Sequence, residues 1–552
     1  MRRYPVGIQT FSRIISEGYV YIDKTDLMWK MTRVSPFVFL SRPRRFEKSL
    51  LTTTLCSFFE GRRDLFEGLK VMELEKDWIQ YPVLHIDVSM AKGKPDEESL
   101  RNALMLQIRP LTKLYGSDPN EKLPGEVFAG LIRRAYEQTG RQVVVVIDEY
   151  DAPLLDVLHE EEQLPGFRRV MQEFYQCLKA HEAMIRFCFI TGITKFSQLS
   201  IFSTLNNITN VSLDPDFAAI CGITGEEIDT QMQPDVARLA EEYEVSPQGM
   251  REMLRETYDG YHFAGKSPDI YNPFSLMKAF NQRMLNNFWF ESGTPSYLLQ
   301  QMRRYRTDIS KIDGIVVSSD AFDQPTENMM DALPLLYQSG YLTIKDYDRI
   351  SQEYTLGIPN KEVRVGLTKG LMLPYTGMSA EGVRSGFAVR FWRALRTNDT
   401  DLALRELQAY LEELPYVEGF KKKLEEVSAA EGFYEWSFYL IFSMLNVYVQ
   451  TQVKAAIERE ESHACMDSSE REQVRPKAKC ARGRADMVVF MPDAIYVMEL
   501  KLNGTAQDAL DQIEDKGYAL RYVTDPRRVV KVGIGFSVEK RAMTDYRIVE
   551  GE

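Results

Sequence analysis

The chain has 552 residues, enough for roughly three or four domains of about 150 residues each. Hydrophobic residues make up 44% and charged residues 27%, as is ordinary for a globular protein with several buried cores. Asp and Glu outnumber Lys and Arg by 80 to 68, and the net charge of −12 argues against attraction of nucleic acid to the whole surface, although it permits a local basic groove.

Four short runs rich in Val, Ile and Phe are predicted to be buried strands within residues 1–215, at 36–42, 81–89, 142–150 and 185–194. Each is followed by residues with helical spacing, which predicts a parallel sheet covered on both faces. The first run leads into "SRPRRFEKSL" and then into an apolar helix that ends near Gly61. That order of strand, loop and helix is the setting that a phosphate-binding loop requires.

The middle of the chain is predicted to hold three further parts. Residues 216–300 are helical and charged and would form a helical lid. Residues 301–377 resemble a winged-helix module, because a helix at 329–340 is followed by strands at 341–348 and 353–363. Residues 378–425 are helical with many charges and could act as a spacer.

Residues 426–552 are predicted to form a small α/β domain. Its elements follow the order αβββαβ, with helices at 433–445 and 505–520 and strands at 447–453, 485–491, 494–502 and 529–537. The chain as a whole is therefore predicted to be a multidomain α/β protein.

Three observations narrow the class of protein. The six cysteines form no CxxC pair, so neither a zinc site nor a redox motif is indicated. The first residues lack the apolar core of a signal peptide. The longest apolar stretch, 436–449, falls short of the about 20 residues that cross a bilayer. We therefore expect a cytoplasmic protein with reduced thiols and no membrane partner.

The first candidate site combines the loop with the ends of two later strands. A triphosphate site needs backbone N–H groups at a helix N-terminus, a lysine for the phosphates and a hydroxyl for Mg²⁺, and Lys48 and Ser49 match the last two. Asp148 would hold the magnesium shell and Glu149 could activate the attacking water. Thr191, at the end of the fourth run, is the candidate that senses the γ-phosphate.

Six motifs together resemble the bacterial AAA-ATPase-like proteins that carry a C-terminal PD-(D/E)XK nuclease domain. They are "VGIQTFSRIISEGYVYIDKT", "SRPRRFEKSLL", "VVVVIDEYDAPL", "FITGITKFS", "YDGYHF" and "YNPFSL". The resemblance covers nearly the whole chain and implies a P-loop, parallel-sheet ATPase core with a helical lid and a winged-helix module behind it. The ATP-binding residues that it implies are Arg45, Phe46, Glu47, Lys48, Ser49 and Leu50, with Asp148 and Thr191.

One residue of the loop departs from this family. The family loop reads RPRRFGK, so Arg42 is normal but Glu47 replaces a glycine. Glycine permits backbone angles that a Cβ penalises and lets the backbone approach the phosphates. A carboxylate at about 5 Å from a phosphate would cost several kcal/mol. We therefore expect strongly weakened ATP binding, unless Glu47 turns away to pair with Arg44 or Arg45. The sequence leaves open whether Glu47 is natural or was introduced to disable the ATPase.

The second candidate site lies in the C-terminal block. Asp486 starts one predicted strand, and Glu499 and Lys501 lie on the next, where residues i and i+2 face the same side. The pattern D-x12-E-x-K resembles the PD-(D/E)XK signature. Asp486 and Glu499 would then be Mg²⁺ ligands, and Lys501 would orient the water or stabilise the developing charge. By the same resemblance, Gln512 on the next helix lies beside this site.

Two further features are ambiguous. Glu431 matches an acidic position of the family's first nuclease helix, but a helix N-terminal acid that stabilises the dipole explains it equally well. A basic stretch before Asp486 could contact DNA or be a solvated loop. Its cations are Arg471, Arg475, Lys477, Lys479, Arg482 and Arg484.

The sequence therefore favours a Mg²⁺-dependent nuclease that acts on DNA and is coupled to an ATPase module. The resemblance suggests a role in defence against foreign DNA or in its processing, and ATPases of this general type often assemble into homo-oligomers. The alternative is a non-catalytic, ATPase-like scaffold that binds DNA or a protein partner.

Overall fold

The computed structural model gives the chain two compact units. The first consists of Met1–Thr307 with Ile312–Arg364, and the second of Asp308–Lys311 with Val365–Glu552. No helix among the described residues has both the length and the apolar character needed to span a bilayer. The residues that the structure describes are 2–158, 160, 162–194, 207–292, 296–305, 307, 312–324, 329, 331–376, 387–413, 448–454, 484–491, 493–537 and 542–550.

A five-stranded parallel sheet forms the centre of the first unit, in the order β2-β3-β4-β1-β5. The prediction of a parallel sheet is confirmed. All six residues of β3 are buried, because helices cover both faces of the sheet and leave no polar side for alternation. The strands are β1 (Phe37–Ser41), β2 (Val83–Asp87), β3 (Val143–Asp148), β4 (Ile185–Gly192) and β5 (Thr209–Asn210).

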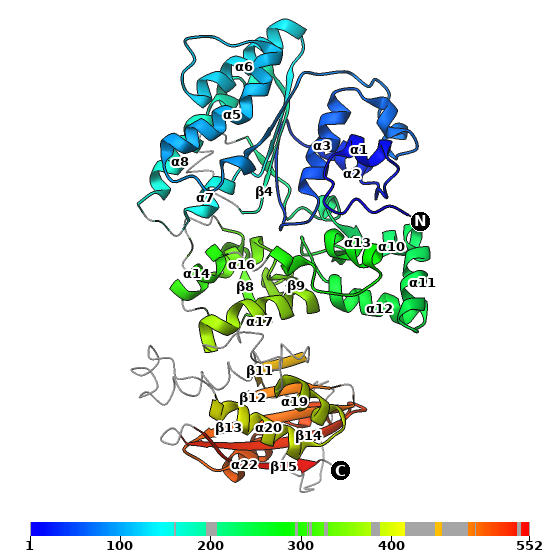
Figure 1. The fold of residues 1–552 in the computed structure, drawn as a ribbon, viewed down its shortest axis with the longest axis vertical. Coiled ribbons are helices and arrows are strands. Elements are labelled where there is room, and N and C mark those ends of the chain that lie inside the picture. The colour runs from blue at the N-terminus through cyan, green and yellow to red at the C-terminus, as the bar shows by residue number, and fades with distance from the viewer. Residues whose placement is uncertain are drawn as a thin grey trace, which may run out of the picture. The chain divides into compact units, whose positions relative to one another are not determined.

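The helices of this core divide between the two faces of the sheet. Figure 1 shows α1, α2 and α3 on one side and α5, α6 and α8 on the other. The helices are α1 (Phe11–Ser16), α2 (Thr25–Met31), α3 (Lys48–Phe59), α4 (Val71–Leu74), α5 (Glu97–Tyr115), α6 (Pro124–Thr139), α7 (Ala152–Asp156), α8 (Leu164–Tyr175) and α9 (Cys177–Ala180).

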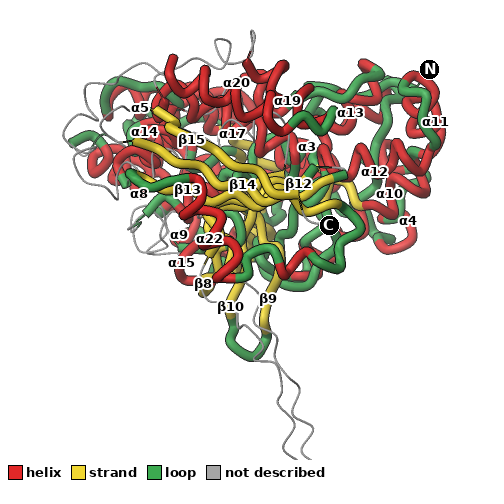
Figure 2. The backbone as a smooth tube through the Cα atoms, turned by 90° about the horizontal axis from the view of Figure 1, so that it is seen from below, coloured by secondary structure: helices red, strands yellow, loops and turns green. Residues whose placement is uncertain are grey.

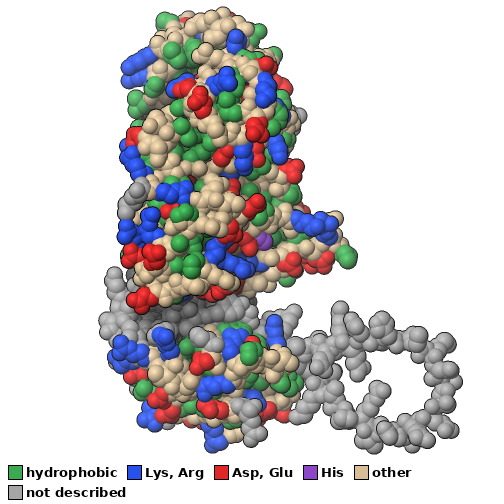
Figure 3. Space-filling view, turned by 90° about the vertical axis from the view of Figure 1, so that its right-hand side faces the viewer, with side chains coloured by type: hydrophobic (Ala, Val, Ile, Leu, Met, Phe, Trp, Pro, Cys, Tyr) green, Lys and Arg blue, Asp and Glu red, His purple; other side chains and the backbone are tan. Residues whose placement is uncertain are grey.

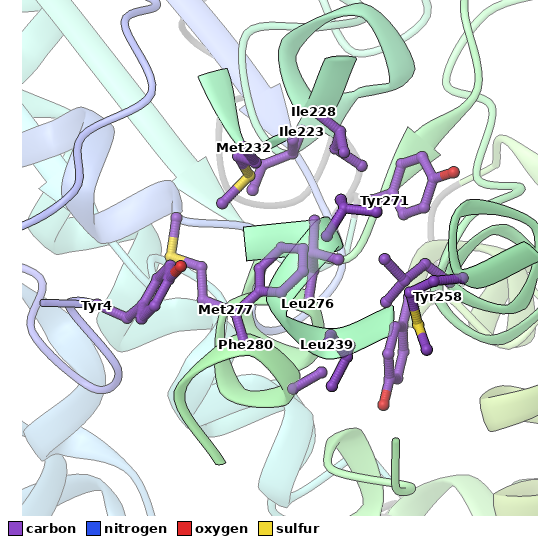
Figure 4. Packing of buried hydrophobic residues seen from close by; sticks show 14 of the residues in the cluster. Tyr4, Ile223, Ile228, Met232, Leu239, Tyr258, Tyr271, Leu276, Met277 and Phe280 are labelled. Carbon is purple, nitrogen blue, oxygen red and sulfur yellow. The ribbon is translucent and has the colours of Figure 1, made fainter. Parts of the chain in front are cut away.

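A helical lid follows the core and packs against the N-terminal segment. Tyr4 stacks on Phe280, with 6.0 Å between the ring centroids, and lies beside Met277 (Figure 4). The first residues of the chain are therefore part of the lid's hydrophobic core. The lid elements are β6 (Ile223–Thr224), α10 (Gly225–Gln231), α11 (Gln233–Glu242), α12 (Pro247–Tyr258), β7 (Ile270–Tyr271) and α13 (Pro273–Gln282).

The next module contains a three-stranded antiparallel sheet in the order β8-β10-β9, where the sequence predicted a two-stranded ribbon. The strand predicted at 353–363 is wrong beyond Gly357. Asn360 caps the following helix, because its side-chain oxygen accepts a hydrogen bond from the N–H of Val363 at 3.0 Å. The elements are α14 (Ser296–Arg304), β8 (Ile315–Ser318), α15 (Ser319–Phe322), α16 (Leu333–Gln338), β9 (Thr343–Asp348), β10 (Glu353–Gly357) and α17 (Lys361–Thr376).

The second unit is built on a five-stranded mixed sheet in the order β11-β12-β13-β14-β15. Strands β13 and β14 are parallel and the other pairs antiparallel. Figure 2 shows α19 and α20 on one face of the sheet and α22 on the other. The elements are α19 (Phe387–Arg396), α20 (Thr400–Glu413), β11 (Tyr448–Lys454), β12 (Arg484–Phe490), β13 (Ala494–Leu502), α22 (Ala506–Lys516), β14 (Arg528–Ser537) and β15 (Ala542–Glu550).

Helices α19 and α20 lie within the segment predicted as a spacer, and they pack on this sheet. Gln408 of α20 donates a hydrogen bond to the carbonyl of Met543, and the hydroxyl of Tyr546 donates to Asp401 at 2.7 Å. Strand β15 was not predicted, because its sequence lacks a continuous apolar run. The helix predicted at 433–445 lies outside the described residues.

Close packing of α22 against β14 fixes the position of this helix. A Cβ added to Gly533 would lie 2.1 Å from the carbonyl oxygen of Ala506 and 2.9 Å from the side chain of Leu510. Only glycine lets the helix approach the strand so closely. This contact brings the polar face of α22 up to the ends of β12 and β13.

Candidate functional site

The predicted phosphate loop joins β1 to the N-terminus of α3, as the sequence order requires. Lys48 is the first residue of α3 and is buried. Its ammonium group donates hydrogen bonds to the carbonyls of Arg42 at 3.0 Å and Pro43 at 3.1 Å. The lysine is thus held inside the loop, at the end of the helix where an anion is stabilised.

Arg42 stands where a glycine-rich loop would have its first glycine. It is buried, and its guanidinium donates to the carbonyls of Ser212 at 2.9 Å and Phe217 at 3.0 Å. These two residues follow β5 in sequence. Arg42 therefore braces the loop against the edge of the sheet.

The end of β3 brings a carboxylate to the start of α3. Burial raises the pKa of Asp148 to about 6, while a hydrogen bond from Ser49 and the charge of Lys48 act in the opposite direction. Glu149 adopts a positive φ of 52° and donates its N–H to Asp148 Oδ1 at 2.9 Å. The structure thus brings together Lys48, Ser49, Asp148 and Glu149, four of the residues that the sequence predicts for this site.

Thr191 lies at the end of β4 but has a different partner. It is fully buried, and its hydroxyl donates to the carbonyl of Leu40 in β1 at 2.7 Å. This hydroxyl therefore holds two strands together, and its role as a γ-phosphate sensor stays a prediction. Asp87, which sequence reasoning missed, is paired with Asp148 in the sheet register and adds a negative charge at this edge.

Glu47 has a left-handed backbone conformation, with φ 58° and ψ 25°. Such angles cost little for glycine and about 1 kcal/mol or more for other residues. Burial raises the pKa of the Glu47 carboxyl to about 7; the charge of Lys24 opposes this rise and that of Glu227 adds to it. The guanidinium of Arg45 stacks on the ring of Phe274, 3.8 Å from its centroid.

Lys24 lies near the end of the motif "VGIQTFSRIISEGYVYIDKT", for which the sequence predicted no chemical role. Its ammonium donates to both carboxylate oxygens of Glu227 in α10 at 2.6 Å, and both side chains are largely buried. The pair joins the N-terminal segment to the lid beside the loop. Lys24 and Glu227 are 203 residues apart in sequence, so no local sequence pattern could have predicted this contact.

The pKa of Glu47 predicts a pH-dependent stability. Folding raises this pKa from 4.5 to about 7, so the stability that the carboxyl contributes is present below pH about 4.5 and is lost as the pH rises through about 7. Glu47→Gln stays neutral. Its midpoint of thermal unfolding should therefore exceed that of the unmodified protein by an amount that grows between about pH 5 and about pH 8. A constant difference would contradict this expectation, and exposed Glu244→Gln is the control.

Asp151 is a second residue that the sequence analysis missed, although it lies in the "DEYD" motif. Its fully buried carboxylate accepts hydrogen bonds from the N–H of Ile193, from the N–H of Thr194 at 2.6 Å and from the hydroxyl of Thr194 at 2.7 Å. It therefore ties the loop after β3 to the end of β4.

Asp151→Ala should lower the free energy of unfolding by about 2–4 kcal/mol, because buried N–H groups would lose their charged partner. Chemical denaturation measures this loss. Asp64→Ala, at an exposed carboxylate, should leave the free energy of unfolding nearly unchanged. Equal effects of the two substitutions would show that Asp151 does not brace the loop.

The second site lies where β12 and β13 run side by side. Glu499 is buried, and its Oε2 accepts a hydrogen bond from the N–H of Asp486 at 3.2 Å. Asp486 Oδ2 in turn accepts from the N–H of Leu500 at 2.9 Å. Burial, together with the nearby charge of Asp486, holds the pKa of Glu499 well above its usual range. The carboxylates of Asp486 and Glu499 therefore lie close together in a poorly solvated environment.

Helix α22 contributes an amide that bridges the remaining groups. Gln512 Nε2 donates to Glu499 Oε1 and, at 3.2 Å, to the hydroxyl of Tyr518. Gln512 Oε1 accepts from the ammonium of Lys501 at 2.5 Å, and that ammonium lies 3.6 Å from Glu499 Oε1. The structure therefore gathers Asp486, Glu499, Lys501 and Gln512, on three elements, as predicted.

The donor set of this site fits a hard divalent cation. Carboxylate oxygens are the ligands that Mg²⁺ prefers, and a cation held by Asp486 and Glu499 would offset both the burial and the nearby negative charge that raise the pKa of Glu499. Among the described residues no group of three or more metal-ligating side chains occurs. Glu431 and the basic stretch at 471–483 lie outside the described residues.

Comparisons with known proteins match both ends of the chain. Residues 5–202 match a family model described as predicted AAA-ATPase, and residues 468–546 match one for the PD-(D/E)XK nuclease superfamily. An uncharacterized protein in the vnfD 5′ region of Azotobacter chroococcum mcd 1 is 30% identical over 551 residues, which are 99% of this chain and 98% of that protein.

Two solved structures show more distant similarity. A Walker-type ATPase of Pyrococcus abyssi has a TM-score of 0.32 and 13% identity, over 66% of this chain and 97% of its own. The Drosophila ORC bound to GC-rich DNA and Cdc6 has a TM-score of 0.21 and 10% identity, over 53% of this chain and 43% of its own.

Proposed function

This chain belongs to the family of AAA-ATPase-like proteins with a C-terminal PD-(D/E)XK nuclease domain, and from this premise we propose that it is a Mg²⁺-dependent nuclease that hydrolyses phosphodiester bonds of DNA. We further propose that the ATPase-like module regulates this activity and that Glu47 weakens its binding of ATP.

The bridging position of Gln512 is the observation that carries the proposal. One amide contacts a carboxylate that would hold a metal and a lysine that would face the phosphate. A solvent-facing edge of a strand hairpin would need no such bridge. Glu499 is also too deeply buried for a surface carboxylate, at 1% exposure.

Each residue of the second site would have its own role in phosphodiester hydrolysis. Asp486 and Glu499 would hold Mg²⁺, which supplies a polarised water and screens the charge of the scissile phosphate. Lys501 donates to Gln512, and this hydrogen bond holds its ammonium near Glu499, where it can stabilise negative charge that develops on the phosphate. Tyr518 accepts a hydrogen bond from the amide of Gln512 and so fixes which way the amide faces.

Attraction of DNA would depend on a local group of cations. On the face drawn in Figure 3, basic and acidic side chains of the described residues are interspersed, without a continuous basic tract. The net charge of −12 gives no general attraction either. We therefore propose that the basic stretch at 471–484, which precedes Asp486, supplies the phosphate contacts.

The direct test is incubation of the full chain with supercoiled plasmid DNA, with Mg²⁺ or Mn²⁺ and with a chelator. Cleavage should require the metal, and single-stranded DNA and RNA tested in parallel identify the preferred substrate. Failure to cut any of these with any divalent metal would overturn the nuclease assignment.

A second candidate function is favoured by the loop itself. The ammonium of Lys48 is already satisfied by two carbonyls, and Glu47 places a carboxyl beside the start of α3. In this alternative the first unit is a nucleotide-insensitive scaffold that binds DNA or a protein partner. It predicts no metal-dependent cleavage and no binding of ATP.

A further inference from the structure

Consecutive residues of the phosphate loop are held by segments that follow the ATPase core in sequence. Phe46 is fully buried and packs edge-on against the rings of Tyr261 and Phe263, with ring centroids 4.7 Å and 5.2 Å away. Pro43 packs so closely on Gly340 that an added Cβ there would lie 2.6 Å from it. A loop built of glycines could make none of these contacts, so the large side chains join the loop to the lid and to the module behind it.

Trp289 makes the most direct of these connections. It is the first residue of a short 3₁₀ helix (Trp289–Ser292) and is 7% exposed. Its indole N–H donates to the carbonyl of Arg44 at 3.3 Å, and its ring packs on Tyr341 with centroids 5.2 Å apart. The hydrogen bond reaches the loop backbone, so it acts on the groups that bind phosphate.

The hydrogen bond to Arg44 fixes the orientation of one peptide group. In a planar trans peptide the carbonyl and the following N–H point in opposite directions. With the Arg44 carbonyl directed toward Trp289, the N–H of Arg45 must point the other way. Backbone N–H groups of such loops are the ones that bind phosphate oxygens.

Trp289 is also bound to the start of α17. Its backbone N–H donates at 2.8 Å to Glu362, the second residue of that helix, which is 1% exposed. The same carboxylate oxygen accepts from the hydroxyl of Ser275 at 3.0 Å. Helix α17 begins in the first unit and continues into the second, since the boundary falls between Arg364 and Val365.

We infer that Trp289 is a positioning residue that sets the Arg44–Arg45 peptide for phosphate binding and couples the state of the loop to the first turn of α17. The part that concerns phosphate rests on the proposed function. The coupling itself is a property of the fold, because the indole and the backbone N–H of one buried residue hold the two segments. Coupling is reciprocal, so a change at either end must alter the other.

Hydrogen exchange of the full chain without nucleotide tests the coupling. Trp289→Phe keeps a large ring but removes the indole N–H. It should speed amide exchange about five- to tenfold both in peptides covering 43–48 and in peptides covering 361–368. Trp29→Phe is the matched control, because the indole of Trp29 donates to Glu75 at 3.2 Å, away from the loop, and should leave both segments unchanged.

The reciprocal substitution, Glu362→Ala, removes the oxygen that accepts the hydrogen bond from the N–H of Trp289 and should speed exchange in the loop at 43–48. The coupling would be overturned if each variant sped exchange in only one of the two segments, 43–48 or 361–368. It would also be overturned if neither variant changed exchange in either segment. A further experiment adds Mg-ATP to the Glu47→Gly protein, where ATP should slow amide exchange in both segments. The slowing should be smaller in the protein that also carries Trp289→Phe. If ATP protects nothing in any variant, the proposed ATP site fails, while the nucleotide-free comparison still decides the coupling.

Discussion

Glu499→Gln is expected to reduce metal-dependent DNA cleavage by about 10³-fold or more while leaving the fold intact. The substitution removes one of the two carboxylates that would hold Mg²⁺, and the loss of such a ligand costs several kcal/mol of transition-state stabilisation. The fold should persist because the raised pKa of Glu499 already favours its neutral form when no metal is bound, and glutamine imitates that form.

Initial rates of plasmid cleavage measure this effect, and calorimetric titration with Mg²⁺ or Mn²⁺ should show weaker metal binding in parallel. Glu514→Gln is a matched control on the same unit, because Glu514 is exposed and pairs with Lys531 of β14. Its cleavage rate should stay within about twofold of the unmodified protein. Unchanged cleavage by Glu499→Gln would remove Glu499 from the site.

Glu47→Gly is expected to strengthen ATP binding by about 10- to 100-fold. Two effects combine in this substitution. Glycine adopts the positive φ of 58° without strain and allows closer approach of the phosphates. Removal of the carboxylate also removes repulsion, which Lys24 and the raised pKa of Glu47 already reduce in part. The gain is therefore smaller than the several kcal/mol expected from the sequence for a fully charged carboxylate.

Calorimetry with Mg-ATP measures the affinity, and two variants separate the causes. Glu47→Gln removes the charge but keeps the Cβ, so it should recover only part of the gain. Glu244→Gly relieves a positive φ of 54° elsewhere in the first unit and should leave the affinity unchanged. Equal affinities of the unmodified protein and Glu47→Gly would show that this residue does not govern nucleotide binding.

Local patterns were sufficient to predict the elements whose environment is uniform. The run from Val143 to Ile147 is apolar throughout because both faces of the central sheet are covered. The spacing of Glu499 and Lys501 on one strand placed both side chains on one face, where the structure has them 3.6 Å apart. Asp486 joined them because a hairpin pairs adjacent strands, a short-range arrangement.

Contacts between distant segments could not be predicted in this way. Lys24 binds Glu227, which is 203 residues away in sequence, and Trp289 donates a hydrogen bond to Arg44, which is 245 residues away. Strand β8 was not predicted, because it has only four residues and its side chains are intermediate or exposed, so it forms no long apolar run. The hydroxyl of Thr191 was expected near a phosphate, but its nearest acceptor is a backbone carbonyl of the neighbouring strand.

The packing of α19 and α20 on the C-terminal sheet determines how this protein can be divided into fragments. These helices bury Phe391, Leu395, Leu404 and Leu407, each at 1% exposure or less. A recombinant fragment that begins at residue 468, where the nuclease match begins, would lack both helices and present that side of the sheet to solvent. Such a fragment should aggregate, whereas one that begins before Lys361 keeps both helices and the whole of α17 and should remain dispersed.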